Sequence, residues 1–311
     1  MILAHDLTKR FNGRPAVDHV SFDIPQGQVV GFLGPNGAGK TTTMRLLTAY
    51  LSPDEGHAEL AGLRVDREPL AVRRRLGYLP EDNPLWEDLE LTEALHFAGR
   101  LRGLTQDRER EARVRAVVRS CGLRREVGTR VGELSKGFRQ RLGLAAAIIH
   151  DPEILILDEP TSGLDPNQVL EVRDLIRELR TQKTVLISTH ILPEVTATCD
   201  RVIIINAGRI AADGTPADLA GSLADKNRLH VELKAPAQAA AQALAGLPGA
   251  ARVLTPAAGG ALTIESAAGV DLREEVFRLA VRNDWPILSL RQERLSLEEV
   301  FRALTKDADQ P

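Results

Sequence analysis

Eight consecutive residues of this sequence have types and a spacing that suit phosphate chemistry. They occupy positions 34–41 and read Gly-Pro-Asn-Gly-Ala-Gly-Lys-Thr. Glycines allow successive backbone N–H groups to converge on phosphate oxygens, and a helix N-terminus directly after them favours an anion. Lys40 is therefore expected to reach the β- and γ-phosphates of a nucleotide, and the Thr41 hydroxyl to bind Mg²⁺. The expected nucleotide-binding residues are Gly34, Pro35, Asn36, Gly37, Ala38, Gly39, Lys40, Thr41 and Thr42.

Two acids follow a continuous apolar run further along the chain. Residues 154–157 are all Ile or Leu, and Asp158 and Glu159 come directly after them. Beside a phosphate loop, an acid at a strand end holds Mg²⁺ directly or through water, so Asp158 and Thr41 are expected metal ligands. Glu159 is then placed to polarise the attacking water as general base. The alternative is a pair of solvated acids in a loop, which we would favour if the phosphate loop were absent.

The elements that must position these residues follow from the apolar pattern. Residues 1–224 alternate apolar strand-like runs with amphipathic helical stretches, which predicts an α/β sheet fold. A buried strand is expected at 29–33 and a helix at 39–51, so the glycine-rich motif has the context that its mechanism requires. A chance glycine-rich turn, the alternative for this motif, lacks that context. Residues 84–121 are expected to be helical.

The character of the sequence changes near Ala224. The elements expected beyond it are a strand at 229–234, a helix at 237–244, strands at 252–255 and 261–265, a helix at 272–280, a strand at 287–291 and a last helix at 297–304. The order βαββαβ matches a ferredoxin-like unit. The sequence therefore predicts a first domain over residues 1–224 and a small C-terminal α+β domain over residues 225–311.

Composition limits the class of protein. The chain has 311 residues, of which 43% are hydrophobic and 27% charged, and its net charge is −3. These values predict a globular protein with a sizeable core, and they give no indication of nucleic-acid binding. Cys121 and Cys199 have no metal-binding spacing and are expected to be reduced thiols of a cytosolic protein. No signal peptide is expected, and no apolar run approaches the roughly 20 residues that span a bilayer.

Three further motifs narrow the class of phosphate-loop protein. Leu-Ser-Lys-Gly-Phe at 134–138 precedes a helix, Ser-Gly-Leu-Asp at 162–165 follows the acids, and His190 ends the next strand. This ordered set resembles the ABC ATPase family, and the resemblance covers residues 1 to about 220. It implies a P-loop NTPase fold with a helical subdomain, binding of ATP and Mg²⁺, and ATP hydrolysis.

The resemblance also implies a role for each motif. Ser135 and Gly137 match the signature loop, which contacts the γ-phosphate of ATP held by the other protomer. His190 matches the switch histidine that contacts the γ-phosphate, and we count it as catalytic. Asp165 matches the loop that joins the two sites, and Phe11 matches the aromatic side chain that stacks on adenine.

Two segments depart from the family pattern. The signature has Lys136 and Phe138 where the family usually has Gly and Gln, and Glu81 stands where the family's glutamine loop has Gln. We count Glu81 as a further expected metal ligand. Both departures, together with Leu-Glu-Glu-Val-Phe at 297–301, look like the branch that includes gliding-motility-associated ATPases and other type-2 exporters. ATPases of that branch often carry a small extra C-terminal domain, which we expect to be regulatory or to stabilise the dimer.

The function that the resemblance implies is that of the ATP-hydrolysing subunit of an ABC transporter, and in this branch an exporter. The chain would form a homodimer, or a heterodimer with a related ATPase. It would drive a separate integral membrane permease from the cytoplasm, as a peripheral protein on the inner face of the cell membrane. No nucleic-acid partner and no direct insertion into the membrane are expected.

Two other classes of phosphate-loop protein are alternatives to the transporter subunit. A soluble ABC ATPase could act on a motility machine, on ribosomes or on DNA. The ribosomal type resembles two fused ATPase units and the DNA-repair type carries a very long coiled coil, and this sequence has one unit and no coiled-coil insertion. The other class is a phosphate-loop GTPase or kinase, but the chain has no Asn-Lys-x-Asp guanine motif.

Overall fold

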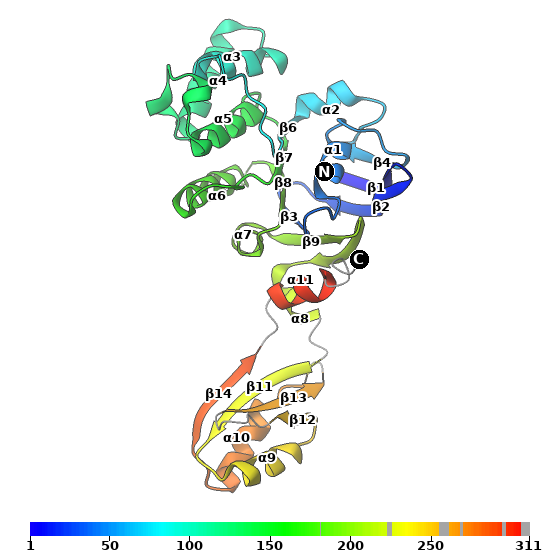
Figure 1. The fold of residues 1–311 in the computed structure, drawn as a ribbon, viewed down its shortest axis with the longest axis vertical. Helices are drawn as coiled ribbons and strands as arrows, with labels where there is room; N and C mark the ends of the chain where they lie inside the picture. The colour runs from blue at the N-terminus through cyan, green and yellow to red at the C-terminus, as the bar shows by residue number, and fades with distance from the viewer. Residues whose placement is uncertain (181, 223–225, 255–260, 268–269, 294–296, 306–311) are drawn as a thin grey trace. The chain divides into compact units, whose positions relative to one another are not determined.

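The structure is a computed structural model that describes residues 1–180, 182–222, 226–254, 261–267, 270–293 and 297–305. The chain forms two compact units (Figure 1), and each is described by itself. The first unit contains Met1–Pro216 together with Leu304, whose carbonyl accepts a hydrogen bond from Asn206 Nδ2 at 2.9 Å. The second unit begins at Ala217, before the expected boundary, because helix α8 (Pro216–Ser222) groups with it.

In the described part of the first unit, a six-stranded sheet has the order β10-β9-β3-β8-β7-β6. The strands from β9 to β6 are parallel, and β10 pairs with β9 antiparallel. The bounds are β3 (Val29–Leu33), β6 (Leu76–Leu79), β7 (Ile154–Asp158), β8 (Thr184–Thr189), β9 (Arg201–Asn206) and β10 (Arg209–Gly214).

The central sheet is covered on both faces, and its strands divide their side chains between two apolar cores. Along β7, Ile154 and Ile156 enter one core, whereas Leu155 and Leu157 enter the other. Alternate side chains of a strand point to opposite faces, so a strand buried on both faces has an unbroken apolar sequence. This explains why the run at 154–157 contains no polar residue.

One core lies under a second, antiparallel sheet of order β2-β1-β4-β5 and under helix α1. Figure 1 shows this sheet with α1 and α2 on one side of the central strands. The expected helix at 39–51 ends early, because Thr48 is its C-cap and Ala49 has a left-handed φ of 57°. The bounds are β1 (Ile2–Phe11), β2 (Arg14–Ile24), β4 (Glu55–Leu60), β5 (Leu63–Arg64), α1 (Lys40–Leu47) and α2 (Pro69–Arg75).

The other core lies under helices on the opposite side (Figure 1). The prediction of helix throughout 84–121 is wrong in two places: residues 84–90 are not helical, and the chain turns at 102–106, where Gly103 has a φ of 93°. A capping box between Glu90 and Glu93 starts the first helix at Leu91. The bounds are α3 (Leu91–Leu101), α4 (Asp107–Ser120), α5 (Lys136–Ile148), α6 (Pro166–Arg180) and α7 (Leu192–Thr198).

The second unit has the predicted order βαββαβ, and its sheet order β12-β13-β11-β14 is antiparallel throughout the described strands. Leu229 and Val231 on β11 are buried against Ala240, Leu244 and other apolar side chains of the helices. One buried face per strand agrees with the alternation of apolar and polar residues at 229–233. The bounds are β11 (Lys226–Leu233), α9 (Ala237–Ala245), β12 (Ala250–Leu254), β13 (Leu262–Ala267), α10 (Arg273–Arg282), β14 (Ile287–Glu293) and α11 (Leu297–Thr305).

Two sequence expectations concern the chain as a whole. Cys121 and Cys199 are both free thiols, as predicted. Among the helices that the structure describes, none has the length and apolar character to cross a membrane.

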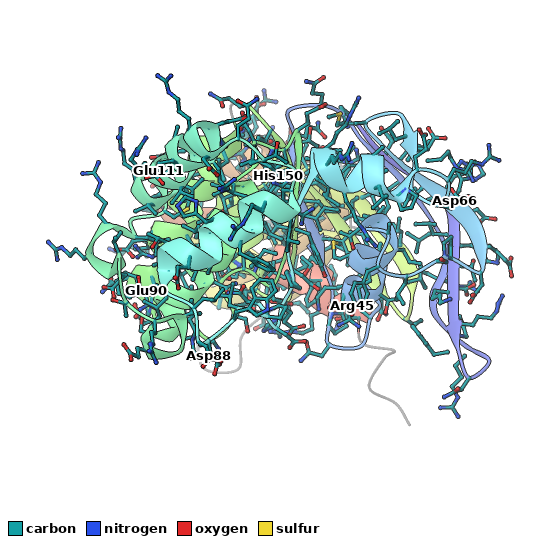
Figure 2. The ribbon with its side chains drawn as sticks, turned by 90° about the horizontal axis from the view of Figure 1, so that it is seen from above. Arg45, Asp66, Asp88, Glu90, Glu111 and His150 are labelled. Atoms are coloured by element: carbon teal, nitrogen blue, oxygen red, sulfur yellow. The ribbon has the colours of Figure 1, made fainter. Side chains whose placement is uncertain are left out.

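His150 follows α5 at the point where the helices meet the central sheet. Figure 2 labels it between the helical side, which carries Glu111, and the side that carries Asp66. Its Nε2 lies 3.1 Å from the Leu76 carbonyl oxygen, and its Nδ1 is buried without a hydrogen-bond partner. Burial lowers the pKa of His150 from 6.5 to about 4, and the nearby Arg102 guanidinium contributes to the shift. The folded protein therefore keeps this ring neutral, with Nε2–H donating to Leu76.

Protonation of His150 should make the folded state less stable in acid. Between pH 6.5 and about 4 the unfolded chain takes up a proton at His150 that the folded chain does not, so this part of the stability is lost as the pH falls. We expect the urea midpoint of the wild type to fall over this range, and that of His150→Gln to fall less steeply. Glutamine can donate to the same carbonyl but does not titrate. Equal slopes of midpoint against pH in the two proteins would contradict the assignment.

Candidate functional site

The loop at 34–39 joins β3 to α1, and close backbone contacts require glycine at two of its positions. Gly39 has a φ of 107°, and a Cβ there would lie 2.4 Å from the Ala16 carbonyl oxygen. A Cβ at Gly34 would lie 2.6 Å from the Ile205 carbonyl oxygen. Gly37 also has a left-handed φ, of 78°, but has open space beside it. The loop is thus pressed against β2 and β9 at two positions, and its middle faces free space.

Lys40 is buried at the first turn of α1. Its Nζ donates to the Gly34 carbonyl oxygen at 2.8 Å and to the Pro35 carbonyl oxygen at 3.2 Å. The same ammonium group lies 3.6 Å from Glu159 Oε1. The positive charge is therefore held at the loop by two neutral carbonyls and one carboxylate, at the place where phosphate oxygens are expected.

A cavity of about 440 Å³ lies in front of this loop. It brings together residues that follow the carboxyl ends of β3, β6, β7 and β8, the edge at which α/β sheets bind ligands. Most of the predicted site residues line it, and Ala16 and Ser162 line it without having been predicted. The lining residues are Ala16, Asn36, Gly37, Gly39, Lys40, Thr41, Thr42, Glu81, Glu159, Ser162 and His190.

Asp158 ends β7 and is fully buried. Its Oδ1 accepts hydrogen bonds from Ser188 Oγ and, at 3.4 Å, from Thr41 Oγ1, whereas its Oδ2 is buried without a hydrogen-bond partner. Burial raises the pKa of the Asp158 carboxyl, and the hydrogen bond from Ser188 opposes this shift. An unpartnered carboxylate oxygen beside a threonine hydroxyl suits a hard cation that takes oxygen ligands.

The donor set also limits how such a cation would be held. No group of three or more His, Cys, Asp and Glu side chains within the described ranges is arranged to hold a metal ion. Mg²⁺ is commonly bound by one or two carboxylates together with substrate phosphates, so the pair Thr41 and Asp158 fits it. Glu81 is exposed on the rim of the same cavity, and its role as a metal ligand stays a prediction.

Glu159 follows Asp158 in a conformation that is rare for a residue with a side chain. Its φ is 49°, and its N–H donates to the Ser188 carbonyl oxygen at 3.1 Å and to Ser188 Oγ at 3.2 Å. Both carboxylate oxygens lie 3.0 Å from His190 Nδ1. The left-handed backbone costs on the order of 1 kcal/mol, and Ser188 holds it in place. As a result the buried carboxylate sits between the Lys40 ammonium and the His190 ring.

The remaining predicted residues do not line this cavity. Ser135 caps α5, and its Oγ accepts from Phe138 N at 3.4 Å. A Cβ at Gly137 would lie 2.5 Å from the end of the Gln168 side chain, which would have to move to admit a larger residue. Asp165 directly precedes α6, and its Oδ1 accepts from the N–H groups of residues 167 and 168 at 3.0 Å. Phe11 ends β1 with 47% of its surface exposed.

The two charged departures, Glu81 and Lys136, line a neighbouring cavity of about 260 Å³. The Lys136 ammonium occupies the space that a side chain at Gly163 would need. Lys136 does not line the 440 Å³ cavity of its own chain, so its charge lies outside that site.

Sequence reasoning missed Ser188 as a site residue. Its hydroxyl contacts both acids, and the available signal was a polar residue directly after the apolar run at 185–187.

Comparison with known proteins identifies the class to which this site belongs. The family model described as ABC transporter matches residues 17–162. The daunorubicin/doxorubicin resistance ATP-binding protein DrrA of Streptomyces peucetius is 39% identical over 306 residues, which cover 96% of this chain and 90% of that protein. This chain belongs to the ABC transporter ATP-binding proteins. It is therefore an ABC-type ATPase, and the cavity at the phosphate loop is its expected ATP site.

Two further similarities agree with membership of the ABC family. The Nod factor export ATP-binding protein I of Burkholderia lata is 38% identical over 212 residues, 68% of this chain and 69% of that protein. The solved structure of an ATP binding subunit of ABC transporter has a TM-score of 0.65 and 31% identity, and covers 70% of this chain and 91% of that one. The P-loop NTPase fold expected of the first unit is confirmed.

Proposed function

We propose that this ABC ATPase powers an exporter, and that two copies close on ATP and drive a separate membrane permease. The observation that carries the proposal is that only some of the predicted site residues lie at the ATP cavity of their own chain. The cavity holds the phosphate loop, Glu159 and His190, whereas Ser135, Gly137 and Asp165 lie outside it. A second chain could place its own signature loop over this cavity, and a two-fold axis would then complete two equal sites. The relatives named for Nod factor export and for drug resistance support the exporter class.

The phosphate loop, the two acids and His190 each have a distinct task in this proposal. Lys40 and the backbone N–H groups of the loop bind the phosphates of ATP, and Thr41 and Asp158 hold Mg²⁺. The bound cation neutralises charge on the phosphate oxygens. Glu159 takes a proton from the attacking water. The His190 ring orients the Glu159 carboxylate, since its Nδ1 lies 3.0 Å from both carboxylate oxygens.

An apolar groove of about 170 Å³ beside Glu81 is the surface that we assign to the permease. Trp86 and Leu101 on its border expose 49% and 64% of their surfaces, and large apolar side chains that are left open to water favour contact with another protein. Other lining residues are Tyr78, Leu79, Pro80, Asn83, Pro84, Leu85, Ala98, Arg102, Gly143, Ala146 and Ala147. Because Glu81 lies next to this groove and also lines the ATP cavity, it is placed to couple the two.

Dimerisation that depends on ATP tests the proposal. Glu159→Gln should bind Mg-ATP without hydrolysing it, so we expect sedimentation velocity to show a monomer without nucleotide and a dimer with saturating Mg-ATP. A chain ending at Pro216, directly before the second unit begins, should dimerise more weakly, because we assign the second unit to regulation or support of the dimer. A protein that stays monomeric with bound Mg-ATP would overturn the two-chain mechanism. Equal dimerisation of the shortened chain would overturn only the role of the second unit.

A further inference from the structure

A buried carboxylate outside the ATP cavity links the loop that follows the proposed base to the end of strand β8. Glu194 lies in the first turn of α7 and is 9% exposed. Each of its carboxylate oxygens lies 2.7 Å from Thr161 Oγ1, and Oε2 lies 3.2 Å from Thr189 Oγ1. Within the described ranges, no lysine, arginine or histidine forms an ion pair with it. Its negative charge is therefore held by two threonine hydroxyls.

The two threonines occupy significant places in the chain. Thr161 follows Glu159 and Pro160, at the start of the loop that leads to Asp165. Thr189 ends β8 and directly precedes His190. The Thr189 hydroxyl also accepts from the N–H of residue 191 at 3.0 Å, so its donor and acceptor capacity are both used. Glu194 thus ties the loop after the base to the strand end that carries the switch histidine.

A second link, made by Ser188, joins the end of β8 to the end of β7 at Asp158 and Glu159. Ser188 contacts the Asp158 carboxylate and the Glu159 N–H. The two links lie on either side of the contact between Glu159 and His190. The Ser188 link holds the backbone of Glu159, and the Glu194 link holds Thr161 and Thr189. The phosphate loop touches the residues of the second link at two points: Thr41 Oγ1 donates to Asp158 Oδ1, and Lys40 Nζ lies 3.6 Å from Glu159 Oε1.

We propose that Glu194 is a positioning residue for ATP hydrolysis, and that it keeps His190 and the loop beginning at Thr161 in the geometry that turnover needs. The inference rests on the proposed roles of Glu159 and His190. Hydrogen bonds to a charged acceptor are roughly twice as strong as neutral ones, and a buried carboxylate that loses a donor leaves its charge poorly satisfied. A displacement of about 1 Å can cost about 10²-fold in rate. Because Glu194 contacts Thr161 and Thr189 and not the phosphate loop, we expect loss of the link to lower turnover and to leave ATP binding unchanged.

Paired substitutions at position 161 test the link. Thr161→Val has nearly the same shape but no hydroxyl, whereas Thr161→Ser keeps the donor. We expect Thr161→Val to lower kcat by about 10-fold or more with KM for Mg-ATP within about threefold of the wild type, and Thr161→Ser to restore most of the loss. Glu194→Gln, which keeps one acceptor oxygen and loses the charge, should resemble Thr161→Val. Thr196→Val on the exposed face of α7 is the matched control and should leave kcat unchanged.

A double variant separates one shared link from two independent effects. If Thr161 and Glu194 act through the same contact, Thr161→Val with Glu194→Gln should lose no more turnover than the worse single variant. Equal kcat values for Thr161→Val and Thr161→Ser would overturn the proposal, as would a loss confined to KM. Glu159→Gln in the same assay reports on the base separately. If that variant keeps its turnover, the proposed base is wrong whatever the Thr161 pair shows.

Discussion

Replacing Glu159 by glutamine should lower the steady-state ATPase rate by about 10²-fold or more, which is the range that general-base catalysis contributes. Glutamine has the same shape but cannot take a proton from water. The carboxylate that it replaces is 4% exposed and is fixed by the Ser188 contacts to its backbone and by His190. Binding of Mg-ATP should persist, because Lys40 keeps its carbonyl partners. The measurement is turnover at saturating Mg-ATP beside a nucleotide affinity.

Glu81→Gln is the matched variant for this prediction. Glu81 lines the same cavity, so it is the other carboxylate that could act on water. It is exposed and follows Pro80 in a loop, whereas Glu159 is buried at the end of a sheet strand, and rigid elements place catalytic groups better than loops do. We expect Glu81→Gln to change turnover by less than about tenfold, with its larger effect on coupling to the permease. A greater loss in Glu81→Gln than in Glu159→Gln would reverse the assignment of the base.

Ser135→Arg should stop turnover while leaving the affinity for ATP near that of the wild type. Ser135 lies outside the cavity of its own chain and caps α5, so a large cation there would obstruct the partner's nucleotide and not its own. Ser135→Ala is the matched control. It removes the cap, which costs about 0.5–2 kcal/mol of stability, without adding bulk or charge, and should keep more activity than Ser135→Arg.

Mixing two inactive chains gives the sharper form of this test. Lys40→Ala removes the phosphate-loop cation, and Ser135→Arg obstructs the signature. A mixed dimer has one site that combines the intact phosphate loop of the Ser135→Arg chain with the intact signature of the Lys40→Ala chain. We therefore expect the mixture to regain turnover that neither variant has alone. Full activity of Ser135→Arg by itself would refute the composite site.

The phosphate loop and the acids were predictable because their chemistry depends on residues that are close in sequence. The spacing at 34–41 requires backbone conformations that glycine adopts, and the φ values of Gly37 and Gly39 agree with it. Asp158 and Glu159 were predictable from the apolar strand before them, which places both at the carboxyl ends of the parallel strands. The element order of the second unit was equally readable, since each of its strands and helices has its own apolar period.

Helix limits were less readable from the sequence. The run at 84–121 has apolar residues at helical spacing almost throughout, but the helices begin only at Leu91 and break at 102–106, where Gly103 takes a left-handed φ. The grouping of Leu304 with the first unit also escaped the sequence. A hydrogen bond joins the Leu304 carbonyl to Asn206, a residue 98 positions away, and no local pattern predicts such a contact.

The links around the base depend on the pairing of β7 with β8. Thr161 and Glu194 are 33 positions apart, and Ser188 is 29 positions from Glu159, so no local pattern relates them. They meet because β7 and β8 are parallel neighbours in register, which brings the ends of both strands to one edge. Strand order is set by the packing of the whole sheet between its two cores, and many orders are compatible with the same apolar runs. For that reason the sequence identifies the phosphate loop and the acids, whereas the fold alone places Ser188 and Glu194 around them.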